Sequence, residues 1–306
     1  VSVGSSLVND VSGNAVTAVA VTNALQAASV TSDASGPSLV GFTLTMDRGE
    51  LSLTFSEPVR ASTVIPTRIT LQASASISDP ATEAVTLSGS QQVSASNSLV
   101  INVTMTVSDM NVVKLRSAVV TTTTYVVLQA GVAQDMNGND AAGIANGSGL
   151  QATSVAGDAT QPTVVSFDLN MNTGVLSLTF DETVSAATLS VQSITLQSAA
   201  SVGGGVVSHT LQGSVSSGST SDGTVLTVTI GADDLNTIKA LPSLASNAGN
   251  TFMSVTSSAV ADMYGNAVVA VADTSALAVS VYTADSTAPV LVSYSVSHLD
   301  RESTPP

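Results

Sequence analysis

The sequence contains no cysteine and no tryptophan, and basic residues are scarce. Without cysteine, the chain can form neither a disulfide framework nor a metal site with thiolate ligands. Seven lysine and arginine residues face 22 aspartate and glutamate residues, so the formal net charge is −15. Such a charge repels the phosphate backbone of nucleic acids, and we therefore expect no nucleic-acid partner.

Long hydrophobic runs are also missing. The apolar stretch at 267–272 ends at Asp273, well short of the roughly 20 residues that a membrane-spanning helix needs. We therefore expect no membrane span in this segment. The sequence opens on Val1, with no basic region and no initiator methionine, and we expect it to be a piece of a longer protein.

The residues that are abundant favour β-structure. Of the 306 residues, 43% are hydrophobic, but only 3% are aromatic and 9% are charged. The hydrophobic residues are thus mostly aliphatic, and serine and threonine fill much of the remainder, which is typical of strands. The length allows two domains with a core each. The acidic surface either keeps the protein soluble or recruits divalent cations.

A block of about 125 residues occurs twice in the sequence. Four segments recur in a single register, which indicates tandem domains of one fold. The matched pairs are 37–46 with 162–171, 51–55 with 176–180, 69–72 with 194–197 and 109–114 with 234–239.

The repeat divides the chain into four segments. An Asp-x-x-Gly-Asn motif occurs at 10–14, 135–139 and 262–266, and an aspartate precedes a proline by four residues at each junction. Such short linkers predict a stiff chain. The predicted segments are 1–36, the C-terminal part of a preceding repeat, 37–161 and 162–288, two complete repeats, and 289–306, the start of a following repeat.

Hydrophobic alternation predicts the strands of one repeat. Apolar and polar residues alternate on both sides of a turn at 47–49, which indicates a β-hairpin with one buried face. Ser108 and Asp109 predict the N-cap of one short helix. Seven or so strands in this length favour an all-β sandwich. Further strands are expected at 68–73, 84–88, 99–107 and 122–130, with a last one beyond Gly138.

These motifs resemble a known family. Leu-Thr-Phe-Ser-Glu-Pro-Val at 53–59, the Ile-Thr-Leu strand, Tyr-Val-Val-Leu at 125–128 and the closing Asp-Met-Asn-Gly-Asn turn are similar to bacterial-type Ig-like repeats of S-layer and giant adhesin proteins. The second copy departs from this pattern at Thr183, where the first has Pro58. The resemblance implies tandem immunoglobulin-like β-sandwich repeats that serve as spacers or adhesive modules in surface fibres. The composition also looks like that of glycosylated filaments and flagellar hairs of protists.

Carboxylates are expected to meet at each junction between repeats. In a seven-stranded Ig topology, the chain entry, the loop after the second strand and the loop before the last strand lie at one end of the domain. Three carboxylates on a short linker are what an interdomain Ca²⁺ would need, whereas turn and capping roles are the alternative. The expected sets are Asp33, Glu57 and Asp135 at one junction, and Asp158, Glu182 and Asp262 at the next.

The sequence offers little for catalysis. His209 and His298 occupy unrelated positions of the repeat, so neither a Ser-His-Asp triad nor a two-histidine metal site is indicated, and we expect exposed loop histidines. Asp233 and Asp234 open the second predicted helix, where negative charge is favourable in any case. We therefore predict no enzyme.

Two sequons are candidates for N-glycosylation in an extracellular protein. Asn146 lies beside two glycines and is the better acceptor, whereas Asn102 lies inside a predicted strand. Clusters of serine and threonine at 121–124, 214–221 and 303–304 either carry O-glycans or are plain polar surface.

Two functions are consistent with these features. The chain is either a stiff spacer in an extracellular filament, fibre or surface layer, or an adhesin module that binds a glycan or a protein. Sugars stack on aromatic faces, and four tyrosines without tryptophan favour the spacer. The expected partners are copies of the chain itself or neighbouring repeats, with glycans as partners of the alternative.

Overall fold

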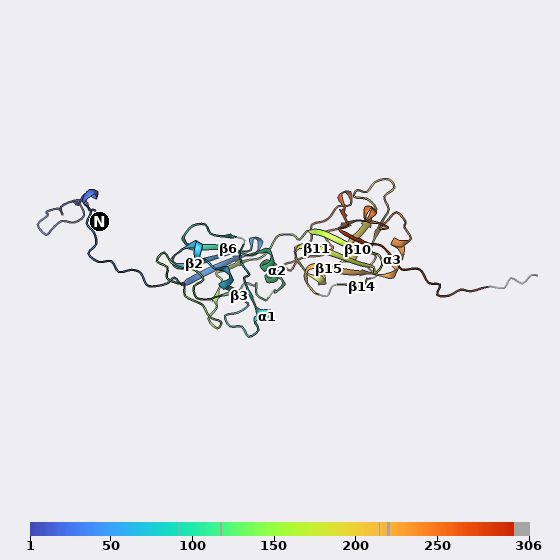
Figure 1. Cartoon of the computed structure of the whole chain (residues 1–306), viewed down its shortest axis with the longest axis horizontal. Helices are drawn as coiled ribbons and strands as arrows, with labels where there is room; N and C mark the ends of the chain where they lie inside the picture. The colour runs from blue at the N-terminus through green and yellow to red at the C-terminus, as the bar shows by residue number, and fades with distance from the viewer. Residues whose placement is uncertain (91, 117, 214, 219–220, 297–306) are drawn as a thin grey trace, which may run out of the picture.

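The computed structural model describes residues 1–90, 92–116, 118–213, 215–218 and 221–296. The chain is all-β with few helices, and its strands form two bodies that follow one another along the long axis of the molecule (Figure 1). We call residues 37–156 the first unit and residues 162–283 the second unit, and residues 157–161 the linker. In the described part of the chain, no helix combines the length and the apolar character that crossing a lipid bilayer requires.

The first unit consists of two sheets with one core between them. One sheet has five strands in the order β5-β6-β2-β1-β9, and the other has four in the order β4-β3-β7-β8. The strands are β1 (Leu39–Thr45), β2 (Glu50–Val59), β3 (Ile69–Gln72), β4 (Ala84–Thr86), β5 (Gln92–Val93), β6 (Ser98–Thr104), β7 (Tyr125–Leu128), β8 (Leu150–Gln151) and β9 (Ser154–Ala156).

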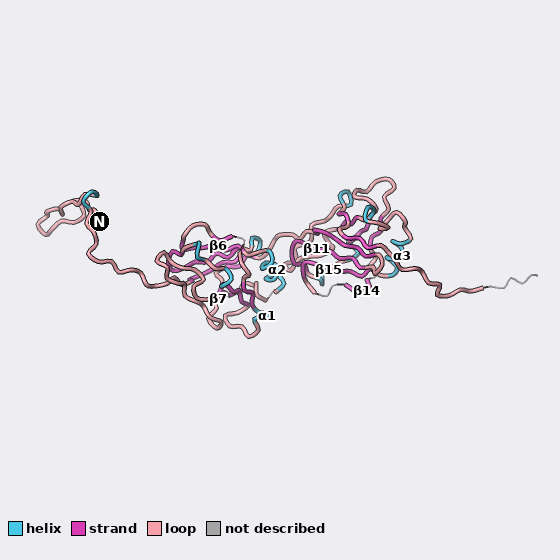
Figure 2. Tube along the Cα trace, viewed as in Figure 1, coloured by secondary structure: helices cyan, strands magenta, loops and turns pink. Residues whose placement is uncertain are grey.

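The second unit has the same two sheets in the same strand order. These are β14-β15-β11-β10-β18 and β13-β12-β16-β17. Figure 2 shows the strands of both units in magenta. The strands are β10 (Val164–Asn170), β11 (Val175–Val184), β12 (Ile194–Gln197), β13 (Ser208–Thr210), β14 (Val215–Gly218), β15 (Gly223–Ile230), β16 (Phe252–Val255), β17 (Leu277–Ala278) and β18 (Val281–Thr283).

The expected hairpin opens each unit in the same register. Phe42 lies opposite Leu53 in the first unit, and Phe167 lies opposite Leu178 in the second. The hairpin turn of the first unit ends at Gly49, whose φ of 58° is the left-handed conformation that favours glycine. In each unit the last strand, β9 or β18, pairs in parallel with the first, β1 or β10.

The core residues expected from the alternation are buried, which confirms that part of the prediction. Phe42 is 1% exposed and Phe167 is not exposed at all. Residues from both sheets of a unit pack into one hydrophobic cluster, and the two clusters share no residue. The buried pairs at matched positions are Phe42 and Phe167, Leu53 and Leu178, Phe55 and Phe180, Ile69 and Ile194, and Leu71 and Leu196.

One helix crosses the end of each unit. In the first unit it is α2 (Val107–Leu115), and in the second it is α3 (Ala232–Lys239). The predicted N-cap at Ser108 is wrong, because α2 begins at Val107 and the Thr106 hydroxyl accepts the Asp109 N–H. A second helix, α1 (Pro80–Glu83), was not expected from the sequence, and the Asp79 carboxylate caps it.

Short 3-10 helices fill several connections. They are η1 (Val21–Asn23), η2 (Met46–Arg48), η3 (Ala61–Thr63), η4 (Pro66–Arg68), η5 (Ala186–Thr188), η6 (Val191–Ser193), η7 (Ala248–Asn250) and η8 (Asp273–Ser275). The strand expected at 122–130 is shorter than predicted, because the Thr124 hydroxyl bonds backbone groups of Thr121 in a turn before β7. The expected last strand is two short strands, β8 and β9.

The segments outside the two units lie mostly in solvent. Residues 1–36 contain the isolated bridges Val3–Val19 and Asn9–Ala15, and Val11 is fully exposed. Residues 284–296 are extended and exposed. Residues 297–306, which include His298 and the serine and threonine at 303–304, lie outside the described residues, as do residues 214, 219 and 220 of the cluster at 214–221.

We expect the two cores to respond alike to truncation. Phe42→Ala and Phe167→Ala should each lower the free energy of unfolding by about 3–5 kcal/mol, because each leaves a cavity in a closed core. Val40→Ala and Val165→Ala are matched controls, since their side chains are 57% and 56% exposed, and should change it by less than about 0.5 kcal/mol. Chemical denaturation measures both, and equal stability of the Phe42→Ala and Val40→Ala variants would contradict the assignment of the core.

Candidate functional site: the joint between the units

The joint between the two units gathers three carboxylates. Asp158 lies on the linker, Glu182 near the end of β11, and Asp262 at the start of a turn in the second unit. One oxygen of each lies within 4.8 Å of the others, and all three residues are buried. We call this set the second triad. The sequence therefore identified the residues that meet here.

The Asp-x-x-Gly-Asn turn positions Asp262. Its Oδ1 accepts the N–H groups of Tyr264 and Asn266 at 2.9 and 2.7 Å. The Asn266 side chain then donates to the Asp158 carbonyl at 3.0 Å, so the turn also holds the linker. Gly265 has a φ of 89°, which explains the glycine in the motif.

The basic residue of the joint is Lys114, from the last turn of α2. Its Nζ lies 2.5 Å from Asp158 Oδ2 and also contacts Glu182 Oε2. The side chains of Lys114 and Asp158 are only 4% and 1% exposed. The first unit, the linker and the second unit thus meet at one ammonium group.

Lys114 was not identified as a site residue from the sequence. A signal for it existed, because lysine recurs at the same place in both helices, as Lys114 and Lys239, in a chain with very few basic residues.

Further hydrogen bonds join the units around the ion pairs. The Thr183 N–H donates to Asn111 Oδ1, and the Thr183 hydroxyl donates to the Asn111 carbonyl, both at 3.1 Å. Asp47 of η2 accepts the N–H of Ala159 on the linker at 2.6 Å. These bonds restrict rotation of one unit against the other.

The charges at the joint shift the pKa of its groups. Burial raises the pKa of Glu182 to about 7, and although Lys114 opposes this, the carboxylates of Asp158 and Asp262 add to it. Burial alone would lower the pKa of Lys114, but its contacts with Asp158 and Glu182 outweigh burial and raise it. The lysine is therefore charged, whereas Glu182 takes up a proton near neutral pH.

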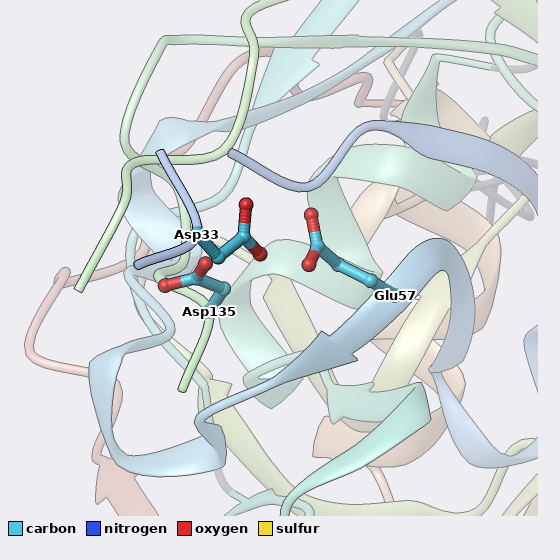
Figure 3. Close-up of side chains that lie close together, drawn as sticks. All are labelled: Asp33, Glu57 and Asp135. Carbon is cyan, nitrogen blue, oxygen red and sulfur yellow. The ribbon is translucent and has the colours of Figure 1, made fainter. Parts of the chain in front are cut away.

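Equivalent carboxylates meet at the entry to the first unit. Asp33, Glu57 and Asp135 lie within 4.8 Å of one another by one oxygen each, and we call them the first triad (Figure 3). Asp135 accepts the N–H groups of Asn137 and Asn139, and the Asn139 side chain donates to the Asp33 carbonyl at 3.1 Å. This turn therefore holds its linker as the turn at Asp262 does.

The first triad differs from the second in its counter-charge. Within the described residues, neither a lysine nor an arginine makes an ion pair with it. Partial burial, Asp33 and Asp135 together raise the pKa of Glu57. Burial would also raise the pKa of Asp135, but hydrogen bonds from Asn139 and Asn137 outweigh it and lower that pKa.

The far end of the second unit has some of the contacts that are found at the joint. Lys239 Nζ lies 2.9 Å from Asp285 Oδ2, as Lys114 pairs with Asp158. Asn172, at the position of Asp47, accepts from the Ser286 N–H and the Thr287 hydroxyl. The side chains of Lys239 and Asp285 are 31% and 32% exposed, whereas that of Lys114 is 4% exposed. The second unit, which covers Lys114, accounts for this difference.

His209 does not lie in an exposed loop, and that expectation is wrong. It belongs to β13, and its Nε2 lies 2.8 Å from Asp234 Oδ1, with the histidine side chain 15% exposed. Asp234 also accepts the Gln212 N–H, as Asp109 accepts the Ser88 N–H. The aspartate therefore fastens its helix to the sheet, and the histidine packs against this contact.

The two sequons lie in different surroundings. Asn146 is exposed, its Oδ1 accepts the Ile77 N–H and its Nδ2 donates to the Ile77 carbonyl. Asn102 lies half-buried on β6, where its Oδ1 accepts the Ser52 hydroxyl. Asn146 thus offers the more accessible amide.

No protein-family model matches the sequence, and the comparison with curated proteins gives no match. Among solved structures, the chain is similar to the N-terminal part of the bacterial S-layer protein SbsC and to the S-layer protein rSbsC, each at 17% identity and a TM-score of 0.26 over 46% of this chain. The matches span 30% and 18% of those two chains. A TM-score this low does not establish a shared fold.

The joint should weaken as the pH rises. Glu182 binds a proton up to about pH 7 in the closed joint but titrates near its ordinary pKa of about 4.3 when exposed. Protonation of Glu182 therefore stabilises the closed joint fully below about pH 4.3. This stabilisation is lost as the pH rises through about 7. Glu182→Gln should remove this dependence, whereas Asp273→Asn, at an exposed position outside the joint, should leave it.

Spin labels can measure this opening. Ser96→Cys and Ser258→Cys place one label at an exposed position of each unit, and no native cysteine competes for them. The distance distribution should broaden from pH 5 to pH 8 in the otherwise native chain and stay constant in Glu182→Gln. A distribution that narrowed with rising pH would contradict the assignment.

Calcium at the triads stays a prediction. At the second triad an ammonium group and a calcium ion would repel each other, so we expect calcium to bind only the first triad of the native chain. At a hundredfold excess over its dissociation constant, it should stabilise the protein by about 2.7 kcal/mol. Glu57→Gln should weaken binding, and Lys114→Ala should add a second site. Calorimetric titration counts the sites, and an unchanged melting temperature after chelation would contradict the prediction.

Proposed function

We propose that the chain is a stretch of tandem immunoglobulin-like repeats that acts as a stiff spacer in an extracellular filament, fibre or surface layer. The observation that carries this proposal is the buried joint. Units joined by a simple tether move freely against one another. Here the side chains of Lys114 and Asp158 lose almost all contact with water, and two charges buried together need the geometry that keeps them paired.

The arrangement of the units supports the same function. They follow one another along the long axis of the molecule, so each unit adds its own length (Figure 1). The linker between them is short, and hydrogen bonds from both sides hold it at Ala159 and at the Asp158 carbonyl. A chain of such units would extend without folding back on itself.

A place at the cell surface and N-glycosylation belong to this proposal. Asn146 is the better candidate because it is exposed. Its Nδ2 keeps one hydrogen after attachment of a glycan, so its bond to the Ile77 carbonyl is compatible with modification. Asn102 would have to carry its glycan from a half-buried place on β6.

The adhesin alternative has less support. The second unit has a cavity of about 540 Å³ over β12, β13 and β16, where a ligand could lie. Its lining residues carry hydroxyl, amide and aliphatic side chains, such as those of Thr195 and Gln197, together with one acidic residue, Asp273, and no aromatic one. Sugars are bound largely by stacking on aromatic rings, so we favour the spacer.

Removing the lysine should make the rod flexible. Lys114→Ala leaves the second triad buried without its counter-charge, and breaking a buried ion pair in this way costs about 3–5 kcal/mol. The spin-label distance distribution should broaden and the radius of gyration from small-angle scattering should change. Lys239→Ala removes the matched lysine, which is 31% exposed, and should leave both unaltered at a concentration where the chain is monomeric. A Lys114→Ala chain as rigid as the native one would contradict the proposal.

Electron microscopy of the cells that make the protein would test where it is located. Antibodies raised against the chain should label a regular filament or a regular surface layer by electron microscopy. Labelling confined to the cell interior, or to the tips of isolated stalks, would overturn the spacer assignment.

A further inference from the structure

We propose that the first triad is the receptor for the helix lysine of a second copy of this chain, so that copies dock end to end through Lys239. This inference deepens the proposed function and rests on it. It concerns two surfaces at opposite ends of the pair of units, namely the first triad and the Lys239–Asp285 pair.

The receptor is identified by its equivalent in the second unit. Glu182 and Asp262 take the ammonium of Lys114 together with the linker residue Asp158. Glu57 and Asp135 occupy the same places in the first unit, at the end of β2 and at the start of the same turn. The first triad thus has the geometry that binds a lysine elsewhere in this molecule.

The donor is identified in the same way. Lys239 lies in the last turn of α3, as Lys114 does in α2, and each pairs with the aspartate of the linker that follows. Its side chain is 31% exposed, whereas that of Lys114 is 4% exposed. A docked copy would cover the exposed part of Lys239, as the second unit covers Lys114.

The two surfaces are complementary in charge. Three carboxylates whose mutual repulsion helps to raise the pKa of Glu57 gain a positive partner, and Lys239 gains two further carboxylates. One neutral contact would be lost, because Pro58 stands where Thr183 donates its N–H and hydroxyl to Asn111. Docking between copies should therefore be weaker than the internal joint.

Docking also requires one linker aspartate to leave. In the internal joint Asp158 alone contacts both the upstream lysine and the downstream asparagine. Between two copies, Asp285 comes with the donor and Asp33 with the receptor. Asp33 is exposed and the Asp285 side chain is 32% exposed, so either can move away and the other completes the site.

Two variants that each block one end test the inference. Lys239→Glu removes the donor and keeps the receptor, and Glu57→Ala removes a carboxylate of the receptor and keeps the donor. A chelator is kept present, because calcium at the first triad would exclude the lysine. By sedimentation velocity, the native chain should then form oligomers that lengthen between micromolar and millimolar concentration. Each variant alone should stay monomeric, and their mixture should form a 1:1 dimer that does not grow. Arg48→Glu makes the same charge change at an exposed arginine of η2 and should associate like the native chain.

Several results would overturn the inference. It fails if the native chain is monomeric throughout this range, or if Lys239→Glu associates as the native chain does. It also fails if chelation abolishes association while Lys239→Glu does not, since a divalent cation would then be the bridge. A stiff rod that stays monomeric overturns only this inference, whereas a Lys114→Ala chain that stays rigid overturns the proposed function.

Discussion

The structure depends on one buried ammonium group. Lys114 lies out of water, and the second triad has more negative charge than one lysine can neutralise. A charge in such a place is stable only while its partners stay within contact distance. Because the lysine belongs to the first unit and Glu182 and Asp262 to the second, the ion pairs persist only in one relative orientation of the units. The ion pairs of Lys114 thus help to fix the orientation of the second unit relative to the first.

The sheets and turns position this group. In each unit the hairpin brings a glutamate to the entry end, and the Asp-x-x-Gly-Asn turn brings an aspartate beside it. The same turn binds the carbonyl of the preceding linker through its asparagine. A single short motif therefore fixes both an acidic group and the path of the chain. This explains why the motif recurs with its aspartate, glycine and asparagine although the residues between them change.

The sequence predicted most of the strands and the meeting of the carboxylates, because both follow from local pattern and strand order. Alternation placed Phe42 and Leu53 on one face, and the repeat register transferred this to Phe167 and Leu178. The role of Lys114 could not be obtained in this way, because it depends on how two units are oriented and no periodicity encodes that. The environment of His209 was also missed, since its partner Asp234 comes from a separate helix that packs beside β13.

The parallel pairing of the first and last strands has a mechanical consequence. Tension applied along the chain would enter a unit at the start of β1 and leave it at the end of β9, and these strands lie side by side in the same direction. The load therefore slides one strand along the other instead of peeling them apart. In this geometry the hydrogen bonds between the strands share the force and must break together. The second unit is built in the same way through β10 and β18, so neither unit would yield to tension by unzipping from its ends.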